Sequence, residues 1–488
     1  KRAANVRTFF KTPNFFEKNC KKNVKSFPDS AATAPSFSKI NKFAVQIIYK
    51  IIMKKTFIIA SAILAICLSA CSKNDLTEVI NFDEQSEASF RVVEESEITA
   101  QGLYNMTIGA LKNNFKAQIF NGVDNAFELA SGSQDPATKA LPPLLYKTVR
   151  IEYTTLDQDM KPVTASALIV YPLLRKMDKV MLINHGTQIG FTMVPTQYTS
   201  VEAAMAATGA LCILPDYIGL GSSSNHPDLY LNHEVHGRTS VDALLALLDY
   251  AKAKKLQLNS NYKSYIVGYS QGGSVSLASL RRVQQLDKAT QDRIRLDKVY
   301  CGDGPYNLRR TFETYVEDFE NGKELGLGSV IPLVINSMFN SYPTEVADLD
   351  YEDFFTEWAL STGVPQAIKN NSENVIDMLV KFNGKNLDQI LNMEYTEAHP
   401  DHLDRLLELM DRQNLCQGWQ PEYSLKLLHG NPDGVVPFSN FEEAVAGLSN
   451  EKVETKVVDI NTEILSNPLL QHVYGMLVMV EEVLAWKF

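Results

Sequence analysis

The stretch "SYIVGYSQGGSVSLASL", from Ser264 to Leu280, runs from an apolar segment through small residues into a helical pattern. Ser270 stands at the corner, with Gly268 two residues before it and Gly272 two residues after it. Because a serine hydroxyl is a poor nucleophile at its ordinary pKa, it must project toward a base, and a sharp strand-to-helix turn lifts it clear of the sheet. Glycines lack the Cβ atoms that would crowd such a turn. The stretch therefore predicts a nucleophile elbow rather than a loop with a surface serine.

A candidate acid and a candidate base follow this serine in the chain. Asp433 lies in a turn after an apolar run, where a carboxylate can accept the Nδ1–H of an imidazole. His472 comes after the last strand-like run and is the candidate general base. Asp303, which follows the preceding strand-like run, is the competing acid, and either aspartate also fits an ordinary turn. We predict a catalytic triad of Ser270, His472 and Asp433, in the chain order Ser, Asp, His.

The length and the strand pattern place this triad in a large α/β domain. The chain has 488 residues, of which 45% are hydrophobic and 21% are charged, as in globular proteins. Residues 146–172 have the pattern of an antiparallel strand pair, and six shorter apolar runs follow. Several of these runs are hydrophobic throughout, which is typical of parallel strands covered by helices on both faces. We expect a mostly parallel sheet of eight strands. The six runs are KVMLINHG, ALCILPD, SYIVGYS, KVYCGDG, YSLKLLHG and VETKVVDI.

Together these motifs resemble those of α/β-hydrolase serine esterases, in particular the secretory-lipase-like bacterial hydrolases. The resemblance covers residues 145–488 and rests on "NHGT", "LPDYIGLGSS", "GYSQGG" and "HGNPDGVVP", with His472 after them. It implies that the backbone N–H groups of Thr187 and Gln271 form an oxyanion hole. Gln188 is the alternative to Thr187 as the donor from the first loop.

The resemblance implies a serine hydrolase that cleaves carboxylic esters, as an esterase or a lipase, through an acyl-enzyme intermediate and without a cofactor. The helical pattern of residues 307–420 implies a cap that shapes the substrate pocket, or else additional scaffolding. The same triad also suits a peptidase or a thioesterase, because it fixes acyl transfer and not the leaving group. A non-catalytic envelope-binding lipoprotein is a third hypothesis, and its expected signature is the loss of a triad member.

Histidines and cysteines give little indication of a metal site. The sequence HEVH at residues 233–236 is one residue short of H-E-x-x-H, so the two imidazoles are offset from a shared ligand face. After Cys71 only Cys212, Cys301 and Cys416 remain, and the first two lie in apolar runs. We therefore predict no metal ion and at most one disulfide bond.

The N-terminal part has the pattern of a targeting segment. The first methionine is Met53, and residues 1–52 carry eleven Lys or Arg against two acidic residues. Residues 53–70 have the basic start, apolar run and small-residue end of a secretory signal. The closing "LSAC" resembles the lipobox of bacterial lipoproteins and implies lipidation of Cys71, whereas a plain secretory or transmembrane segment is the alternative. We expect residues 1–52 to be an upstream extension, and the mature chain to be lipid-anchored in the bacterial cell envelope, with Ser72 favouring the outer membrane.

The charge balance indicates which partners to expect. Removal of residues 1–70, which hold thirteen basic and two acidic side chains, lowers the net charge from −10 to −21. This excess opposes binding to nucleic acid and to anionic headgroups, so the expected partners are a small-molecule or lipid ester and a membrane reached through acyl chains. Residues 71–144 are predicted to form an acidic tether up to about residue 100, followed by a helical segment. The hydrolase domain is predicted to begin at residue 145.

Overall fold

The computed structural model describes most of the chain from residue 145 onward, together with one earlier strand. The predicted extension 1–52, the signal segment 53–70, the lipidated Cys71 and the helical part of 71–144 lie outside the described residues. The described residues are 89–99, 145–173, 175–188, 194–197, 202, 205, 208–323, 325–372, 380–382, 384–463 and 465–485.

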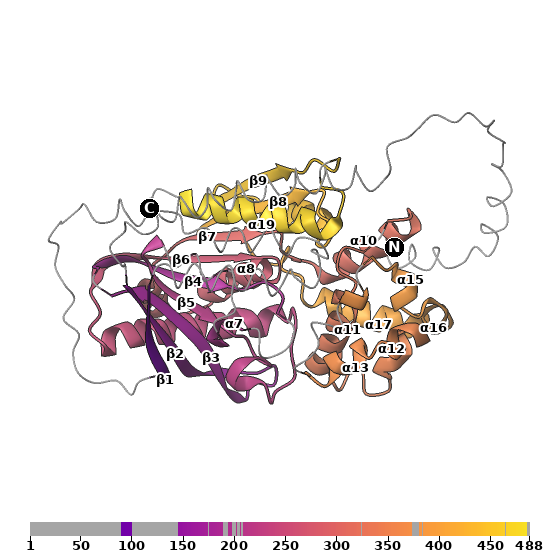
Figure 1. Cartoon of the computed structure of the whole chain (residues 1–488), viewed down its shortest axis with the longest axis horizontal. Coiled ribbons are helices and arrows are strands. Elements are labelled where there is room, and N and C mark those ends of the chain that lie inside the picture. The colour runs from indigo at the N-terminus through magenta and orange to yellow at the C-terminus, as the bar shows by residue number, and fades with distance from the viewer. Residues whose placement is uncertain are drawn as a thin grey trace.

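Nine strands of the described residues form one sheet, in the order β1-β2-β3-β5-β4-β6-β7-β8-β9 (Figure 1). The pairings from β1 to β5 are antiparallel, and the five pairings from β5 to β9 are parallel. The carboxyl ends of the parallel strands therefore share one edge, where the loops that follow them meet. The strands are β1 (Phe90–Thr99), β2 (Leu145–Leu156), β3 (Pro162–Pro172), β4 (Met177–Asn184), β5 (Leu211–Pro215), β6 (Leu258–Tyr269), β7 (Leu296–Gly302), β8 (Ser424–Asn431) and β9 (Val453–Asp459).

Helices cover both faces of the sheet, as the hydrophobic strands predict. Successive residues of β4 point to opposite faces, so Val180 and Leu182 belong to one core while Met181 and Ile183 belong to the other. The first core contains side chains of α7, α8 and α18, and the second contains side chains of α19. The helices packed around the sheet are α7 (His233–Ala253), α8 (Gln271–Gln284), α9 (Lys288–Ile294), α18 (Ser439–Leu448) and α19 (Pro468–Ala485), with short 3-10 turns η1 (Pro195–Gln197) and η3 (Gly221–Ser223).

Between β7 and β8 the chain forms a group of helices beside the sheet, drawn in orange in Figure 1. Their apolar side chains build a third hydrophobic cluster, which also contains Tyr230 and Leu231 from the loop before α7. We call this group the cap helices. They are α10 (Leu308–Glu320), α11 (Val330–Ser341), η4 (Tyr351–Phe354), α12 (Glu357–Ser361), α13 (Val364–Lys369), η5 (Val380–Phe382), α15 (Leu387–Ile390), α16 (Met393–Ala398) and α17 (Pro400–Asp411).

Strand β1 differs from the tether that the acidic composition before residue 100 predicts. Phe90–Thr99 pairs along β2 and adds a ninth strand to the eight expected. The carboxylate of Glu95 lies 3.3 Å from Lys147 Nζ on β2 and 2.9 Å from Lys254 Nζ, which follows α7. The basic partners of this acidic strand lie on other elements, so its local sequence looks like a solvated segment.

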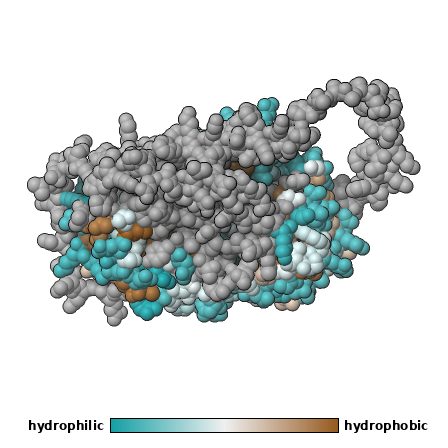
Figure 2. All heavy atoms as spheres, in the orientation of Figure 1, coloured by the Kyte–Doolittle hydropathy of each residue, from teal (hydrophilic) through white to brown (hydrophobic). Residues whose placement is uncertain are grey.

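The described surface carries few large apolar side chains. In Figure 2 hydrophilic residues dominate the visible described surface, and apolar residues form small separate groups. Within the described part of the chain, no helix has the length and apolar character needed to cross a membrane.

In addition to its apolar packing, helix α19 is linked to the sheet by the partly buried carboxylate of Glu482. Its Oε2 accepts hydrogen bonds from the Tyr300 hydroxyl on β7 and from Lys426 Nζ on β8, each at 2.7 Å. Its Oε1 pairs with Lys456 on β9. Hydrogen bonds to a charged group in a partly buried position are stronger than those on an open surface. Through this cluster α19, the helix that carries His472, is bound to three neighbouring strands.

We expect Glu482→Gln to lower the free energy of unfolding by about 2 kcal/mol, because two lysines lose their shared counter-charge. Urea denaturation of the purified chain measures this change. Glu442→Gln, at an exposed position of α18, is the control and is expected to change stability by less than about 0.5 kcal/mol. Equal stabilities of the two variants would contradict the role of Glu482 in attaching α19 to the sheet.

Candidate active site

Ser270 occupies a tight turn between β6 and α8. Its backbone has φ 58° and ψ −125°, a conformation that side chains other than glycine rarely adopt. A Cβ atom at Gly268 would lie 2.1 Å from the carbonyl oxygen of Gly272, and a Cβ at Gly272 would lie 2.1 Å from that of Asn184. Ser270 N–H donates to the carbonyl of Gly302 at 2.9 Å, which holds the turn against β7. The structure thus places Ser270 at the strained strand-to-helix corner that the sequence predicts.

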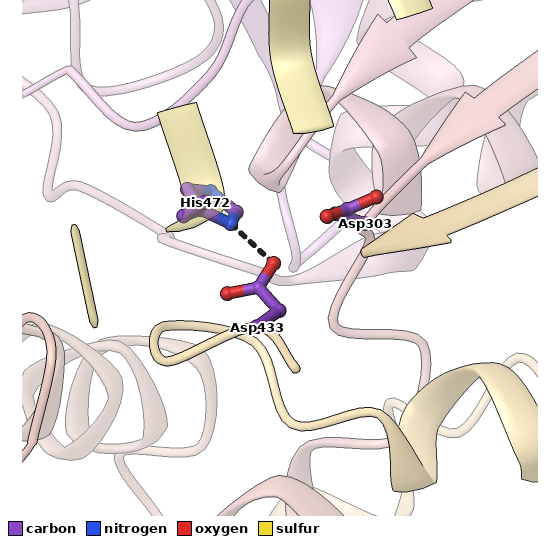
Figure 3. Close-up of side chains that lie close together, drawn as sticks. All are labelled: Asp303, Asp433 and His472. Carbon is purple, nitrogen blue, oxygen red and sulfur yellow. Dashed lines mark hydrogen bonds and ion pairs between the residues drawn. The ribbon is translucent and has the colours of Figure 1, made fainter. Parts of the chain in front are cut away.

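His472 and Asp433 contact each other although 39 residues separate them. Nδ1 of His472, on α19, lies 2.6 Å from Asp433 Oδ2 in the loop after β8 (Figure 3). Asp433 Oδ1 accepts the N–H groups of Val435 at 2.7 Å and of Val436 at 3.0 Å. Within the described part of the chain, the Ser270 hydroxyl forms no hydrogen bond to the His472 ring, and such contacts often tighten only when substrate binds.

The carboxyl group of Asp433 is ionised at neutral pH. Burial alone would raise its pKa, but the charge of the nearby His472 and the hydrogen bond to that histidine outweigh burial and lower the pKa to about 2. A buried carboxylate that accepts Nδ1–H fixes the tautomer of the imidazole and leaves Nε2 as the acceptor for a serine proton. The arrangement suits an acid and base pair that acts on a neighbouring hydroxyl.

Asp303, the competing acid, is fully buried in the loop after β7 and lies beside Asp433 (Figure 3). Its Oδ2 lies 2.7 Å from the hydroxyl of Tyr269 and accepts the N–H of Gly430 at 3.1 Å. Nδ1 of His472 bonds Asp433 and not Asp303. Asp303 therefore contacts the two loops that carry the candidate nucleophile and the candidate acid.

The loop after β4 holds the predicted oxyanion donor. The N–H of Gly186 is already used, because it donates to Glu202 Oε1 at 2.9 Å. The next N–H group along the loop, that of Thr187, is therefore the candidate donor. The hydroxyls of Thr187 and Tyr230 lie 2.9 Å apart. Gln271 is the first residue of α8, where a helix leaves its N–H groups without intrahelical acceptors. Thr187 and Gln271 thus stand on the two segments that flank Ser270.

A small cavity of about 40 Å³ opens beside Ser270. Its remaining lining is mostly apolar and comes from the cap helices, from the loop that follows Asp433 and from the loops after β4, after β7 and before α7. This volume holds about three water molecules. The lining residues are Thr187, Tyr230, Leu231, Ser270, Pro305, Leu308, Thr311, Phe312, Tyr315, Val330, Ile331, Val334, Met410, Val435 and Val436.

Among the described residues, one group could offer ligands to a metal ion: Asp303, Asp433 and His472, with ligand atoms within 4.8 Å of one another. The two histidines of HEVH do not form a site together. His233 Nδ1 contacts the carbonyl of Gln413 at 2.5 Å, and the buried ring of His236 stacks on another aromatic ring. The described cysteines are buried and unpaired.

Three residues support the site although the sequence motifs assign them no role. The Tyr269 hydroxyl lies 2.6 Å from the carbonyl oxygen of His472. Tyr217, whose ring stacks on His185, donates to the carbonyl of His185 at 3.1 Å beneath the Thr187 loop. The third residue is Glu202, described above. The two tyrosines lie inside the motifs GYSQGG and LPDYIGLGSS, and this is the only sequence signal for them, whereas Glu202 has none.

Solved structures with the same architecture include several esterases and lipases. The rice cell wall degrading esterase LipA from Xanthomonas oryzae has a TM-score of 0.61 and 17% identity, over 80% of this chain and 96% of that chain. A structure from Legionella pneumophila has a TM-score of 0.58 and 18% identity, again over 80% and 96%. Candida antarctica lipase A in its closed state has a TM-score of 0.50 and 12% identity, over 80% and 82%.

The chain therefore has the α/β-hydrolase fold, with a mostly parallel sheet, as the sequence motifs predict. No protein-family model matches the chain, and no curated protein matches it. At these identities the likeness establishes the fold alone.

The backbone at Ser270 can be tested by two substitutions that both remove the hydroxyl. Ser270→Gly relieves a strain of roughly 1–3 kcal/mol that Ser270→Ala retains, against an entropic cost of about 1 kcal/mol for glycine. We expect the glycine variant to be more stable than the alanine variant by about 1 kcal/mol in urea unfolding. The same pair at Ser274, inside α8, should give the reverse order. A glycine variant less stable than Ser270→Ala would show an unstrained turn.

The lowered pKa of Asp433 predicts how its contribution depends on pH. Because the folded pKa of about 2 lies below the ordinary value of 3.8, the contribution is present above about pH 4 and is lost as the pH falls toward 2. The difference in unfolding free energy between the wild type and Asp433→Asn should therefore be largest above pH 4 and shrink below it. Urea titrations from pH 3 to pH 7 measure this difference, and a constant difference would contradict the ionised assignment.

Proposed function

We propose that this chain is a serine hydrolase that cleaves carboxylic esters through an acyl-enzyme intermediate. In this proposal Ser270 is the nucleophile, His472 the general base and Asp433 the acid that orients it. The backbone N–H groups of Gln271 and Thr187 form the oxyanion hole. The proposal needs no cofactor, because the triad supplies both the nucleophile and the proton transfers.

The proposed reaction has two half-steps. Ser270 Oγ attacks the ester carbonyl while His472 Nε2 takes the hydroxyl proton, and the two N–H groups stabilise the negative charge that develops on the carbonyl oxygen. His472 then gives that proton to the departing alkoxide, which leaves as the alcohol. In the second half-step a water molecule attacks the acyl-enzyme by the same route and releases the carboxylic acid.

One observation carries the proposal: a buried histidine is bonded to an ionised aspartate at the sheet edge where a serine on a strained turn lines an apolar cavity. Solved structures with this fold include an esterase and a lipase. An apolar lining suits the acyl part of an ester better than a charged group. We further propose that lipidation of Cys71 attaches the enzyme to the bacterial envelope, where small or lipid esters reach it.

The first test uses the purified full chain. It measures hydrolysis of p-nitrophenyl esters from acetyl to palmitoyl and covalent labelling by a serine-directed fluorophosphonate probe. We expect ester turnover and labelling of the wild type, and Ser270→Ala should lose labelling and at least about a thousandfold in kcat. Ser274→Ala, one turn along α8, is the matched control and keeps both. Labelling without ester turnover would favour a peptide or a thioester as substrate. A folded protein with neither activity would favour the envelope-binding hypothesis.

The cavity volume predicts a preference for short acyl groups. Space for about three waters accommodates an acyl chain of a few carbons, so kcat/KM should fall from butyryl to palmitoyl esters. Phe312→Ala removes a ring that lines the cavity and should raise the octanoyl-to-acetyl ratio of kcat/KM roughly tenfold. Phe319→Ala, on the same helix but outside the lining, is the control. An unchanged ratio in the first variant would place the acyl group elsewhere.

A further inference from the structure

Asp303 is buried in a position where an ionised carboxylate would be poorly supported. It has no solvent exposure, and within the described residues no lysine or arginine forms an ion pair with it. Its Oδ2 contacts Tyr269 and Gly430, while its Oδ1 has no hydrogen-bond donor among the described groups. An unpaired charge in such surroundings is costly, and it usually takes up a proton instead.

The Tyr269 hydroxyl contacts two oxygen atoms but has only one hydrogen to donate. It lies 2.6 Å from the carbonyl oxygen of His472 and 2.7 Å from Asp303 Oδ2. A tyrosine hydroxyl has one hydrogen, and a carbonyl oxygen can only accept. When the tyrosine donates to His472, the contact with Asp303 is a hydrogen bond only if the carboxyl group of Asp303 donates.

The neighbouring carboxyl group of Asp433 also favours a proton on Asp303. Oxygen atoms of the two aspartates lie within 4.8 Å, and Asp433 already accepts the N–H groups of Val435 and Val436 and the Nδ1–H of His472. Two ionised carboxylates this close in a buried site repel each other, so one of them holds a proton. Burial, and then the charge of the neighbouring Asp433, raise the pKa of Asp303 well above its ordinary value.

We infer that Asp303 is a neutral carboxylic acid that positions the reactive groups, an inference that rests on the proposed function of those groups. Its carboxyl group joins Tyr269, the residue before Ser270, to Gly430, three residues before Asp433. Tyr269 in turn contacts the backbone of His472. Asp303 is therefore a positioning residue that links the three segments carrying the proposed triad, and it does not act on substrate.

The approach of α19 to this group depends on a glycine. A Cβ atom at Gly475 would lie 2.4 Å from the Tyr269 hydroxyl and 2.8 Å from Asp303 Oδ2. The helix turn after His472 therefore packs directly on the pair of hydroxyl and carboxyl groups. A shift of either group would move the imidazole relative to Ser270.

The test compares three variants of the full chain on the ester that the wild type hydrolyses best. Asp303→Asn keeps the shape and offers an amide N–H donor in place of the carboxyl O–H, so it should lose less than tenfold in kcat. Asp303→Ala should lose about a hundredfold in kcat with KM within twofold, and Tyr269→Phe, which keeps the ring, about tenfold. Asp433→Asn, which replaces an ionised acid, should lose far more, on the order of 10⁴-fold. An asparagine variant as impaired as Asp433→Asn, or an alanine variant as active as the wild type, would overturn the inference.

A second measurement does not depend on activity. The infrared difference spectrum between the wild type and Asp303→Asn at pH 7 should contain the C=O stretch of a protonated carboxylic acid. Asp178→Asn, at an exposed position of β4, is the control and should not remove that band. Absence of the band overturns the neutral assignment. A wild type that shows the band but hydrolyses no ester would refute the proposed function while supporting a neutral Asp303.

Discussion

The direct contact of backbone with backbone around Ser270 is the constraint on which the rest of the site depends. Because Gly268 and Gly272 have no Cβ atoms, α8 starts against the ends of β4 and β6 without an intervening side chain. This contact places the start of α8 directly beside the loop after β4. A larger residue at either glycine would push α8 away from the sheet. The distance between Ser270 and the proposed oxyanion donors would then change as well.

A parallel sheet then gathers the remaining groups. The loops after β6, β7 and β8 carry Ser270, Asp303 and Asp433, and they meet because parallel strands end at one edge. His472 comes from α19, whose position is fixed by the carboxylate of Glu482 and by the contact of Tyr269 with the His472 carbonyl. Ion pairs and hydrogen bonds between distant segments, rather than local sequence, thus fix the distance between base and acid.

Sequence predicted those parts of the fold and site that depend on local chemistry. The elbow at Ser270, the turn at Asp433 and the parallel strands each need particular residues at short spacing, and the structure forms the elbow, the turn and the strands. Strand β1 was not predictable, because its carboxylates are balanced by lysines on β2 and after α7. The roles of Tyr269 and Glu202 were equally hidden, since a single hydroxyl or carboxylate gains its contacts only when remote segments fold together. The catalytic roles themselves remain proposals.

Strand β1 is also an edge strand of the sheet and covers β2. An edge strand presents unpaired N–H and C=O groups that can pair with another molecule, and natural sheets protect such edges with charge and irregularity. Phe90–Thr99 has both, because it carries several glutamates and its register shifts between Val92 and Glu94. A shortened chain starting at residue 145 would expose β2, whose alternate side chains are buried. Such a fragment would present unpaired N–H and C=O groups of β2 at the edge of the sheet, which the acidic strand covers in the full chain.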